Sequence, residues 1–168
     1  MNNSNNTTTL RGVIGIIEKD GKYLFGLESK TGPLNNKWRL LGGKLESGES
    51  SEQALYRELR EEAGIEIAID GFLKTADGTH RDILIDVYHG RWISGNLNPK
   101  LDENSRIDWF SISELASLDV EELSGQAIYD YTLMKIRNER ENANASGNRA
   151  KSESYFGPYM GCDAGAIG

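Results

Sequence analysis

The chain has 168 residues, which is enough for one domain with a hydrophobic core and too few for two ordinary domains. Its net charge of −7 argues against nucleic acid as a partner, because binding to the phosphate backbone requires clustered Lys and Arg. Cys162 is the only cysteine, so no disulfide can form within the chain. No apolar stretch is long enough to span a bilayer, and the polar start lacks the features of a signal peptide, so we expect a cytoplasmic protein with no membrane partner.

The first part of the chain predicts a disordered arm of Asn, Ser and Thr followed by short strands. A strand rich in Val and Ile leads through an Asp-Gly hairpin turn into a second strand. A polar loop then separates this hairpin from a third, short strand. The expected order is arm 1–9, strand 10–18, turn 20–21, strand 22–28, loop 31–37 and strand 38–41.

The second part predicts further strands and two helices. Alternating apolar and polar residues favour a strand around residues 82–88, and a serine cap favours a brief helix near the end of the domain. Gly, Ala, Asn and Ser dominate the last thirty residues, which we expect to form a flexible tail. The expected order is strands 66–75 and 81–92, loop 96–106, strand 107–111, helices 113–118 and 121–140, and tail 139–168.

Between these parts, residues 51–63 are expected to form a helix. Ser50 or Ser51 offers an N-cap hydroxyl, and Gly64 can adopt the left-handed conformation that ends a helix. Leu55 and Leu59 belong to an apolar stripe that can bury against a sheet. An arc of acidic residues lies next to this stripe, so the acids are expected at the rim of the core.

Three glutamates, Glu58, Glu61 and Glu62, are expected within an arc of about 100° on this helix. They repel one another, and two of them lie at the helix end where cations are preferred. A hard divalent cation would reverse these unfavourable interactions, because such ions bind several carboxylate oxygens. The alternatives are a solvated acidic face, or a structural calcium site, against which the lack of an EF-hand loop argues.

The same stretch matches the Nudix box at all nine specified positions, and the chain is therefore similar to the Nudix hydrolase family. The matching residues are Gly43, Glu49, Arg57, Glu58, Leu59, Glu61, Glu62, Gly64 and Ile65. The resemblance extends over residues 10–138 and implies an α/β fold, an α/β/α sandwich around a mixed central sheet. It also implies cleavage of a phosphoanhydride bond in a nucleoside diphosphate derivative, with Mg²⁺ or Mn²⁺ as the cofactor.

The resemblance also implies roles for individual residues. The glutamates matching Glu58, Glu61 and Glu62 hold metal in the family, often with the backbone carbonyl matching Gly42. The glutamate matching Glu49 pairs with the arginine matching Arg57, and a bidentate pair of this kind also makes sense from charge alone.

The sequence Trp38-Arg39-Leu40-Leu41 lacks the proline that many family members have before the paired glycines. Its leading tryptophan resembles the MutT-like subgroup that hydrolyses oxidised purine nucleoside triphosphates. Candidate substrate contacts near the box are Trp38, Arg39 and Lys44, with simple packing as the alternative for Trp38.

The candidates outside the box are less specific. Glu103 is the loop acid that could serve as the general base, and Asp102 and Asn104 could contact a purine edge, with a solvated polar loop as the alternative for all three. His80, Arg81 and Asp82 could line the cleft, although a turn before a strand explains them as well. His89 is expected to be structural.

Two substrate classes compete. A nucleoside triphosphate would be cut to a monophosphate and pyrophosphate, and an ADP-ribose or other ADP-sugar would be cut to AMP and a sugar phosphate. We favour the triphosphate, because nothing after the box marks the ADP-sugar type. A nucleotide sensor without activity is less favoured, since all box glutamates are present. The expected partner is a small nucleotide, and the sequence leaves monomer and homodimer open.

Overall fold

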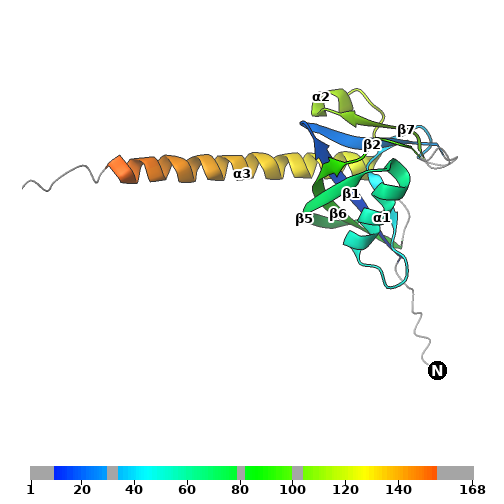
Figure 1. The fold of residues 1–168 in the computed structure, drawn as a ribbon. Helices are drawn as coiled ribbons and strands as arrows, with labels where there is room; N and C mark the ends of the chain where they lie inside the picture. The colour runs from blue at the N-terminus through cyan, green and yellow to red at the C-terminus, as the bar shows by residue number, and fades with distance from the viewer. Residues whose placement is uncertain (1–9, 30–33, 79–81, 100–103, 155–168) are drawn as a thin grey trace, which may run out of the picture. The chain divides into compact units, whose positions relative to one another are not determined.

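The computed structural model describes residues 10–29, 34–78, 82–99 and 104–154, which form seven strands and three helices within those ranges (Figure 1). The chain divides into two compact units between Tyr131 and Thr132, and everything described below on the sheet and the site belongs to the first unit. The elements are β1 Leu10–Lys19, β2 Lys22–Glu28, β3 Trp38–Arg39, β4 Leu41–Lys44, α1 Ser51–Ala63, β5 Glu66–Asp77, β6 Ile83–Ser94, β7 Asn104–Phe110, α2 Ile112–Leu115 and α3 Glu122–Ser154.

Strand β1 organises the sheet. It pairs in parallel with β6 from Leu10 to Glu18, and antiparallel with β4, which places Ile14 opposite Gly42. Beyond the end of β4, β1 continues as a hairpin with β2, and β2 in turn pairs with β3 and β7. Because one neighbour of β1 is parallel and the others are antiparallel, the sheet is mixed, as predicted.

Helix α1 has the bounds that the sequence predicted, and its caps explain why. The Ser50 hydroxyl accepts a hydrogen bond from the Gln53 amide, and the Gln53 side chain accepts one from the Ser50 amide, which completes a capping box. Gly64 ends the helix with φ of 72°, a left-handed conformation that glycine adopts without a steric penalty.

Helices cover both faces of the sheet, which confirms the predicted layered α/β architecture. The buried stripe of α1, including Leu55 and Leu59, packs on Val13 and Ile17 of β1 in the main core cluster. The start of α3 covers the other face, where Tyr131 lies edge-on to Tyr23 and Ala127 is completely buried. Helix α1 is therefore fixed on one face of the sheet by a close-packed hydrophobic core.

Several element boundaries differ from the prediction: the strand expected at residues 38–41 is two strands, β3 and β4, and the brief helix expected at residues 113–118 is Ile112–Leu115. Two further differences have a clear physical reason. Strand β7 begins at Asn104 and not at residue 107, because its polar residues 104–106 pair with β2, where a sequence pattern alone suggests a loop. Helix α3 was expected to end at Arg140 but continues to Ser154. No proline interrupts residues 122–154, which are rich in Ala, Glu, Lys and Arg, so local propensity allows the longer helix. No helix among the described residues is long and apolar enough to cross a membrane.

Candidate functional site

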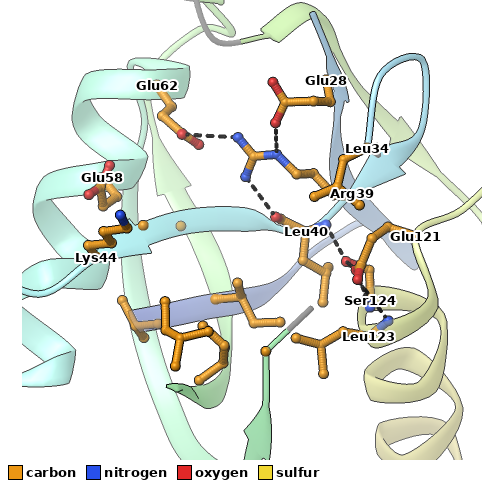
Figure 2. Close-up of a pocket in the computed structure, with 17 residues that line it drawn as sticks. Glu28, Leu34, Arg39, Leu40, Lys44, Glu58, Glu62, Glu121, Leu123 and Ser124 are labelled. Atoms are coloured by element: carbon orange, nitrogen blue, oxygen red, sulfur yellow. Dashed lines mark hydrogen bonds and ion pairs between the residues drawn. The ribbon is translucent and has the colours of Figure 1, made fainter. Parts of the chain in front are cut away.

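A pocket of about 440 Å³ opens beside α1, and acids from several elements meet in it (Figure 2). Glu58 and Glu62 come from α1, Glu28 from the end of β2, and Glu121 from the residue before α3. Its size lies within the range of small-molecule sites. The lining residues are Val13, Ile14, Glu28, Leu34, Arg39, Leu40, Gly42, Gly43, Lys44, Glu58, Glu62, Gly78, Ile83, Ile85, Glu121, Leu123 and Ser124.

Arg39 lies between two of these acids. Its Nε donates to Glu28 Oε2 at 2.9 Å, and its Nη2 donates to Glu62 Oε1 at 3.3 Å. Burial by itself would lower the pKa of Arg39, but the charges and hydrogen bonds of Glu62 and Glu28 outweigh it and raise the pKa. The guanidinium is therefore a permanent positive charge within the pocket.

Two glycines bring the backbone of β4 close to its neighbours. Gly42 has φ of +145°, and a Cβ there would lie 2.1 Å from the carbonyl oxygen of Val13, so no other residue is accommodated. A Cβ on Gly43 would lie 2.1 Å from Glu58 Oε1. The paired glycines thus leave the space next to β4 to the carboxylate of Glu58.

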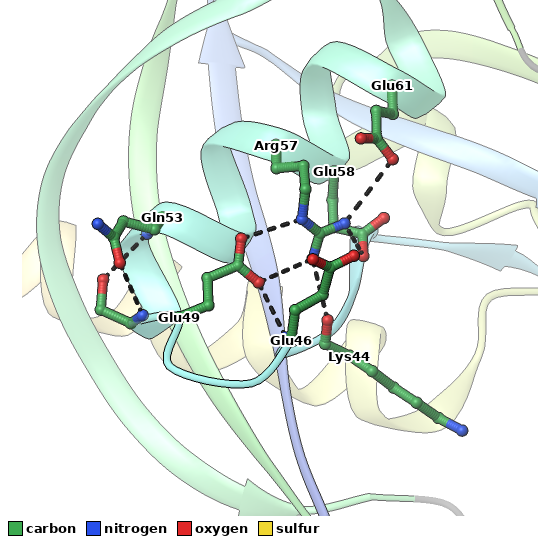
Figure 3. Close-up of polar contacts among 8 residues, drawn as sticks. Lys44, Glu46, Glu49, Gln53, Arg57, Glu58 and Glu61 are labelled. Atoms are coloured by element: carbon green, nitrogen blue, oxygen red, sulfur yellow. Dashed lines mark hydrogen bonds and ion pairs between the residues drawn. The ribbon is translucent and has the colours of Figure 1, made fainter.

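Arg57 braces the loop before α1 against the helix, as predicted (Figure 3). Its Nε and Nη2 donate to the two carboxylate oxygens of Glu49 at 3.0 and 2.9 Å, and Nη2 also donates to the Lys44 carbonyl at 3.1 Å. The hydrogen bond from Arg57 lowers the pKa of Glu49, and that from Glu49 raises the pKa of Arg57. Arg57 Nη1 also contacts Glu58 Oε1 at 2.9 Å, so the brace extends to the pocket acid.

The three box glutamates do not converge in this structure. Glu58 and Glu62 line the pocket, whereas Glu61 is half-exposed and lies 3.7 Å from Arg57 Nη1. Among the residues that the structure describes, no three His, Cys, Asp or Glu side chains are close enough together to hold a metal ion. Arginines contact all three glutamates instead, with Arg57 beside Glu58 and Glu61, and Arg39 beside Glu62.

The other candidates from the sequence lie in different places. Arg39, Lys44 and Gly42 line the pocket. Trp38 does not: it is buried with its ring edge-on to Phe110 at 4.6 Å, a packing position. Asn104 is fully buried beside Gly26, and neither polar atom of its side chain has a hydrogen-bond partner among the described residues.

Of the remaining candidates, Asp102 and Glu103 fall outside the described residues, as do His80 and Arg81. Asp82 is exposed and lies at a turn, where its carbonyl accepts a hydrogen bond from the amide of Leu10. His89 packs on the ring of Tyr131, with 5.1 Å between ring centroids, and burial lowers its pKa. His89 is therefore neutral at physiological pH and positioned by packing.

Sequence reasoning missed two acids that line the pocket, Glu28 and Glu121. Glu28 ends an apolar strand at a buried position, and that one charge in an apolar pattern was a usable signal. Glu121 caps α3: its carboxylate accepts from the amides of Leu123 and Ser124, while Ser124 Oγ accepts from the amide of Leu40. Nothing in the local sequence shows that this cap lies opposite α1, because long-range packing alone brings them together.

Comparisons with known proteins identify the family to which this site belongs. The NUDIX domain model matches residues 8–131. A CTP pyrophosphohydrolase of Escherichia coli is 35% identical over 104 residues, which cover 61% of this chain and 76% of that protein. A nucleoside triphosphatase NudI of Enterobacter sp. is 34% identical over 123 residues, covering 66% of this chain and 87% of that protein. An NAD-capped RNA hydrolase NudC of Pseudomonas aeruginosa is 32% identical over 95 residues, 56% of this chain, but the match spans only 34% of its length.

A solved structure has the same fold. A NUDIX hydrolase from Nitrosomonas europaea superimposes with a TM-score of 0.65 at 31% identity, over 75% of this chain and 90% of that one. The family model covers most of the chain, the paired glycines and two of the box glutamates line one pocket, and the Arg57 brace contacts Glu58 at that pocket. The chain belongs to the Nudix hydrolase family.

Proposed function

We propose that this protein hydrolyses nucleoside triphosphates to monophosphate and pyrophosphate in a reaction that depends on Mg²⁺ or Mn²⁺. The observation that carries the proposal is the composition of one pocket. Two box glutamates and the paired glycines form one part of its lining, two cations line it as well, and aliphatic side chains of Val, Ile and Leu form most of the rest beside two further acids and a serine. A nucleotide has the matching parts, since its phosphates require cations and its base requires an apolar surface.

The residues present suit a hard divalent ion. Glu58 and Glu62 contribute carboxylate oxygens beside the backbone of Gly42 and Gly43, and Mg²⁺ prefers such oxygen ligands. The space that a Cβ on Gly43 would fill is left to Glu58. Glu58 and Glu62 would hold the ion, with Glu61 and the Gly42 carbonyl as further ligands. When bound, the ion supplies charge neutralisation on the phosphates and lowers the pKa of a water molecule.

The chain's own residues would do the remaining work. Arg39 and Lys44 line the pocket and would bind phosphate oxygens by charge-assisted hydrogen bonds. The Glu49–Arg57 brace fixes the loop that leads from the glycines to α1 and thereby the position of Glu58. Leu34, Leu40 and Leu123 line the same pocket and would exclude water from one side of the bound nucleotide.

Triphosphates are favoured over other nucleotides by the relatives. Two relatives that match over most of their own length carry the names CTP pyrophosphohydrolase and nucleoside triphosphatase. The test is a panel of nucleoside triphosphates, ADP-ribose, dinucleoside polyphosphates and NADH with Mg²⁺, followed by product analysis. Turnover of triphosphates is expected, whereas exclusive turnover of ADP-ribose would replace the substrate assignment.

On the best substrate, Glu62→Gln should lower kcat by about 10²–10⁴-fold, because a candidate metal ligand is lost. Glu66→Gln is the matched control, since it makes the same chemical change at a half-exposed acid that pairs with Arg60 just beyond the helix. Equal folding of both variants is checked by circular dichroism. Parental activity in Glu62→Gln would show that this carboxylate does not belong to the reaction centre.

A further inference from the structure

The pocket acid Glu62 is held by an arginine that the family motif does not specify. Arg39 bridges Glu28 and Glu62, and all three side chains are largely buried, with exposed fractions of 15%, 11% and 3% (Figure 2). The two contacts of Arg39 differ in length: 2.9 Å to Glu28 and 3.3 Å to Glu62. Since N–H···O bonds cluster near 2.9 Å, the contact to Glu28 is the firmer of the two.

This ion pair keeps Glu62 in an arrangement that does not yet form a metal site. The box glutamates each contact an arginine, and no three acids converge among the described residues. A divalent ion at Glu62 would bring a second positive charge next to the largely buried guanidinium, where like charges are screened less than at the surface and repel more strongly. Metal and Arg39 therefore compete for the same carboxylate.

We propose that Arg39 is a counter-charge for Glu62. Arg39 binds Glu62 while metal is absent and releases it when a divalent ion binds. The freed Arg39 then binds a substrate phosphate. This inference rests on the metal dependence proposed above. Glu28 is the residue that makes the exchange possible, because it retains Arg39 through Nε when Nη2 leaves Glu62. The freed Nη2 stays within the pocket, where it can donate to an anionic oxygen.

This exchange couples the binding of metal to the binding of nucleotide, because Arg39 opposes metal in the free protein and binds phosphate afterwards. Metal binding frees Arg39 for the nucleotide, and the nucleotide removes Arg39 from the metal ligand, so each ligand favours the other. The enzyme would thus hold metal weakly until substrate arrives. If Arg39 only positioned Glu62 as a metal ligand, the opposite result would be expected, because loss of Arg39 would then weaken metal binding.

The test is calorimetric titration of the nucleotide-free full-length protein with Mn²⁺ alone. Arg39→Gln should bind Mn²⁺ about tenfold more tightly than the parent, which corresponds to about 1.4 kcal/mol. Unchanged or weaker binding in a folded Arg39→Gln protein would overturn the proposal. Arg60→Gln is the control for net charge, since Arg60 is an exposed α1 residue paired with Glu66, and its Mn²⁺ affinity should equal that of the parent.

Glu28→Gln is a second variant, in which the Mn²⁺ affinity is expected to change in the opposite direction. It also tests the proposal if Arg39→Gln does not fold. With the charge of Glu28 removed, Arg39 should hold Glu62 more strongly, and the Mn²⁺ affinity should fall about threefold. Unchanged or tighter binding in Glu28→Gln would contradict the competition. KM for the triphosphate should rise about tenfold in Arg39→Gln, and an unchanged KM would overturn the phosphate contact.

The parent protein separates this inference from the proposed function. If the parent binds no Mn²⁺, the proposed metal dependence fails, and the competition at Glu62 fails with it. If the parent binds Mn²⁺ and hydrolyses nucleotide but Arg39→Gln is not tighter, only the counter-charge proposal is overturned.

Discussion

At the level of single residues, the position of Glu58 depends on the lack of a side chain at Gly43. Gly43 is opposite Val13 in the β1–β4 pairing, and a Cβ there would collide with the carboxylate of Glu58 and not with backbone. The end of a glutamate can rotate away, so the fold would survive the substitution while the carboxylate moved. We therefore predict that a substitution at position 43 affects catalysis more than stability.

Gly43→Ala should lower kcat by about 10²-fold while the protein remains folded, because misplacing a reacting group by about 1 Å has an effect of this size. Steady-state kinetics and thermal unfolding measure the two quantities separately. Gly21→Ala is the contrasting variant: Gly21 has φ of +74° with nothing within 4 Å of its Cβ position, so it should lose some stability and keep parental kcat. A Gly43→Ala enzyme with parental kcat would refute the account of this position.

Part of the candidate site could be predicted from the sequence. The spacing of Glu58 and Glu62 on a helix was sufficient to predict that they share a site, and the pairing of Glu49 with Arg57 was implied by the resemblance to the Nudix family and was consistent with their charges. Glu28 and Glu121 could not be predicted to meet them, because β2 and the start of α3 reach the pocket only through sheet pairing and long-range packing.

At the scale of elements, the start of α1 is tied to the sheet by one buried carboxylate. Asp86 on β6 accepts hydrogen bonds from Ser51 Oγ at 2.6 Å and from Thr75 Oγ1 at 2.8 Å, and it forms an ion pair with Arg11. Burial alone would raise the pKa of Asp86, but these three donors outweigh it and lower the pKa below its usual value of 3.8. The charged form therefore stabilises the fold.

Asp86→Asn should lower the free energy of unfolding by about 1–3 kcal/mol at neutral pH, because hydrogen bonds to a charged acceptor are lost. The folded-state pKa is depressed, so the contribution is complete above the unfolded pKa near 3.8 and is lost as pH falls through the lower folded value. Urea unfolding of parent and variant between pH 7 and pH 3 measures this. A stability difference that stays constant down to pH 3 would contradict the assignment of the charge.

Element boundaries were predictable where local chemistry sets them. The N-cap, the apolar stripe and the C-terminal glycine fixed α1 to the residue. Strand β7 starts earlier than predicted, since the partner strand β2 and not the polarity of residues 104–106 decides the pairing. The far end of α3 was also missed, because the Asn, Ser and Gly residues after Arg140 suggested a tail, although no proline within residues 122–154 interrupts the helix.

At the scale of the whole molecule, the fold brings acids and cations from distant segments to one pocket. The mixed sheet positions β4 beside β1, and the core holds α1 against both. The start of α3 is hydrogen-bonded to β3 through Glu121 and lines another part of the pocket. The family could be predicted from twenty-three contiguous residues, from Gly43 to Ile65, because the box contains the whole brace and the acids. The choice of nucleotide could not, since the leucines and Glu121 at the pocket come from three separate segments.

The reaction that we propose for this protein is metal-dependent attack on a nucleoside triphosphate with release of pyrophosphate. Phosphorus NMR of the parent protein with a nucleoside triphosphate follows the products directly, once in Mg²⁺ and once in excess EDTA. We predict that monophosphate and pyrophosphate signals grow together in Mg²⁺ and are absent in EDTA. Growth of diphosphate and orthophosphate signals, or equal turnover in EDTA, would contradict the account.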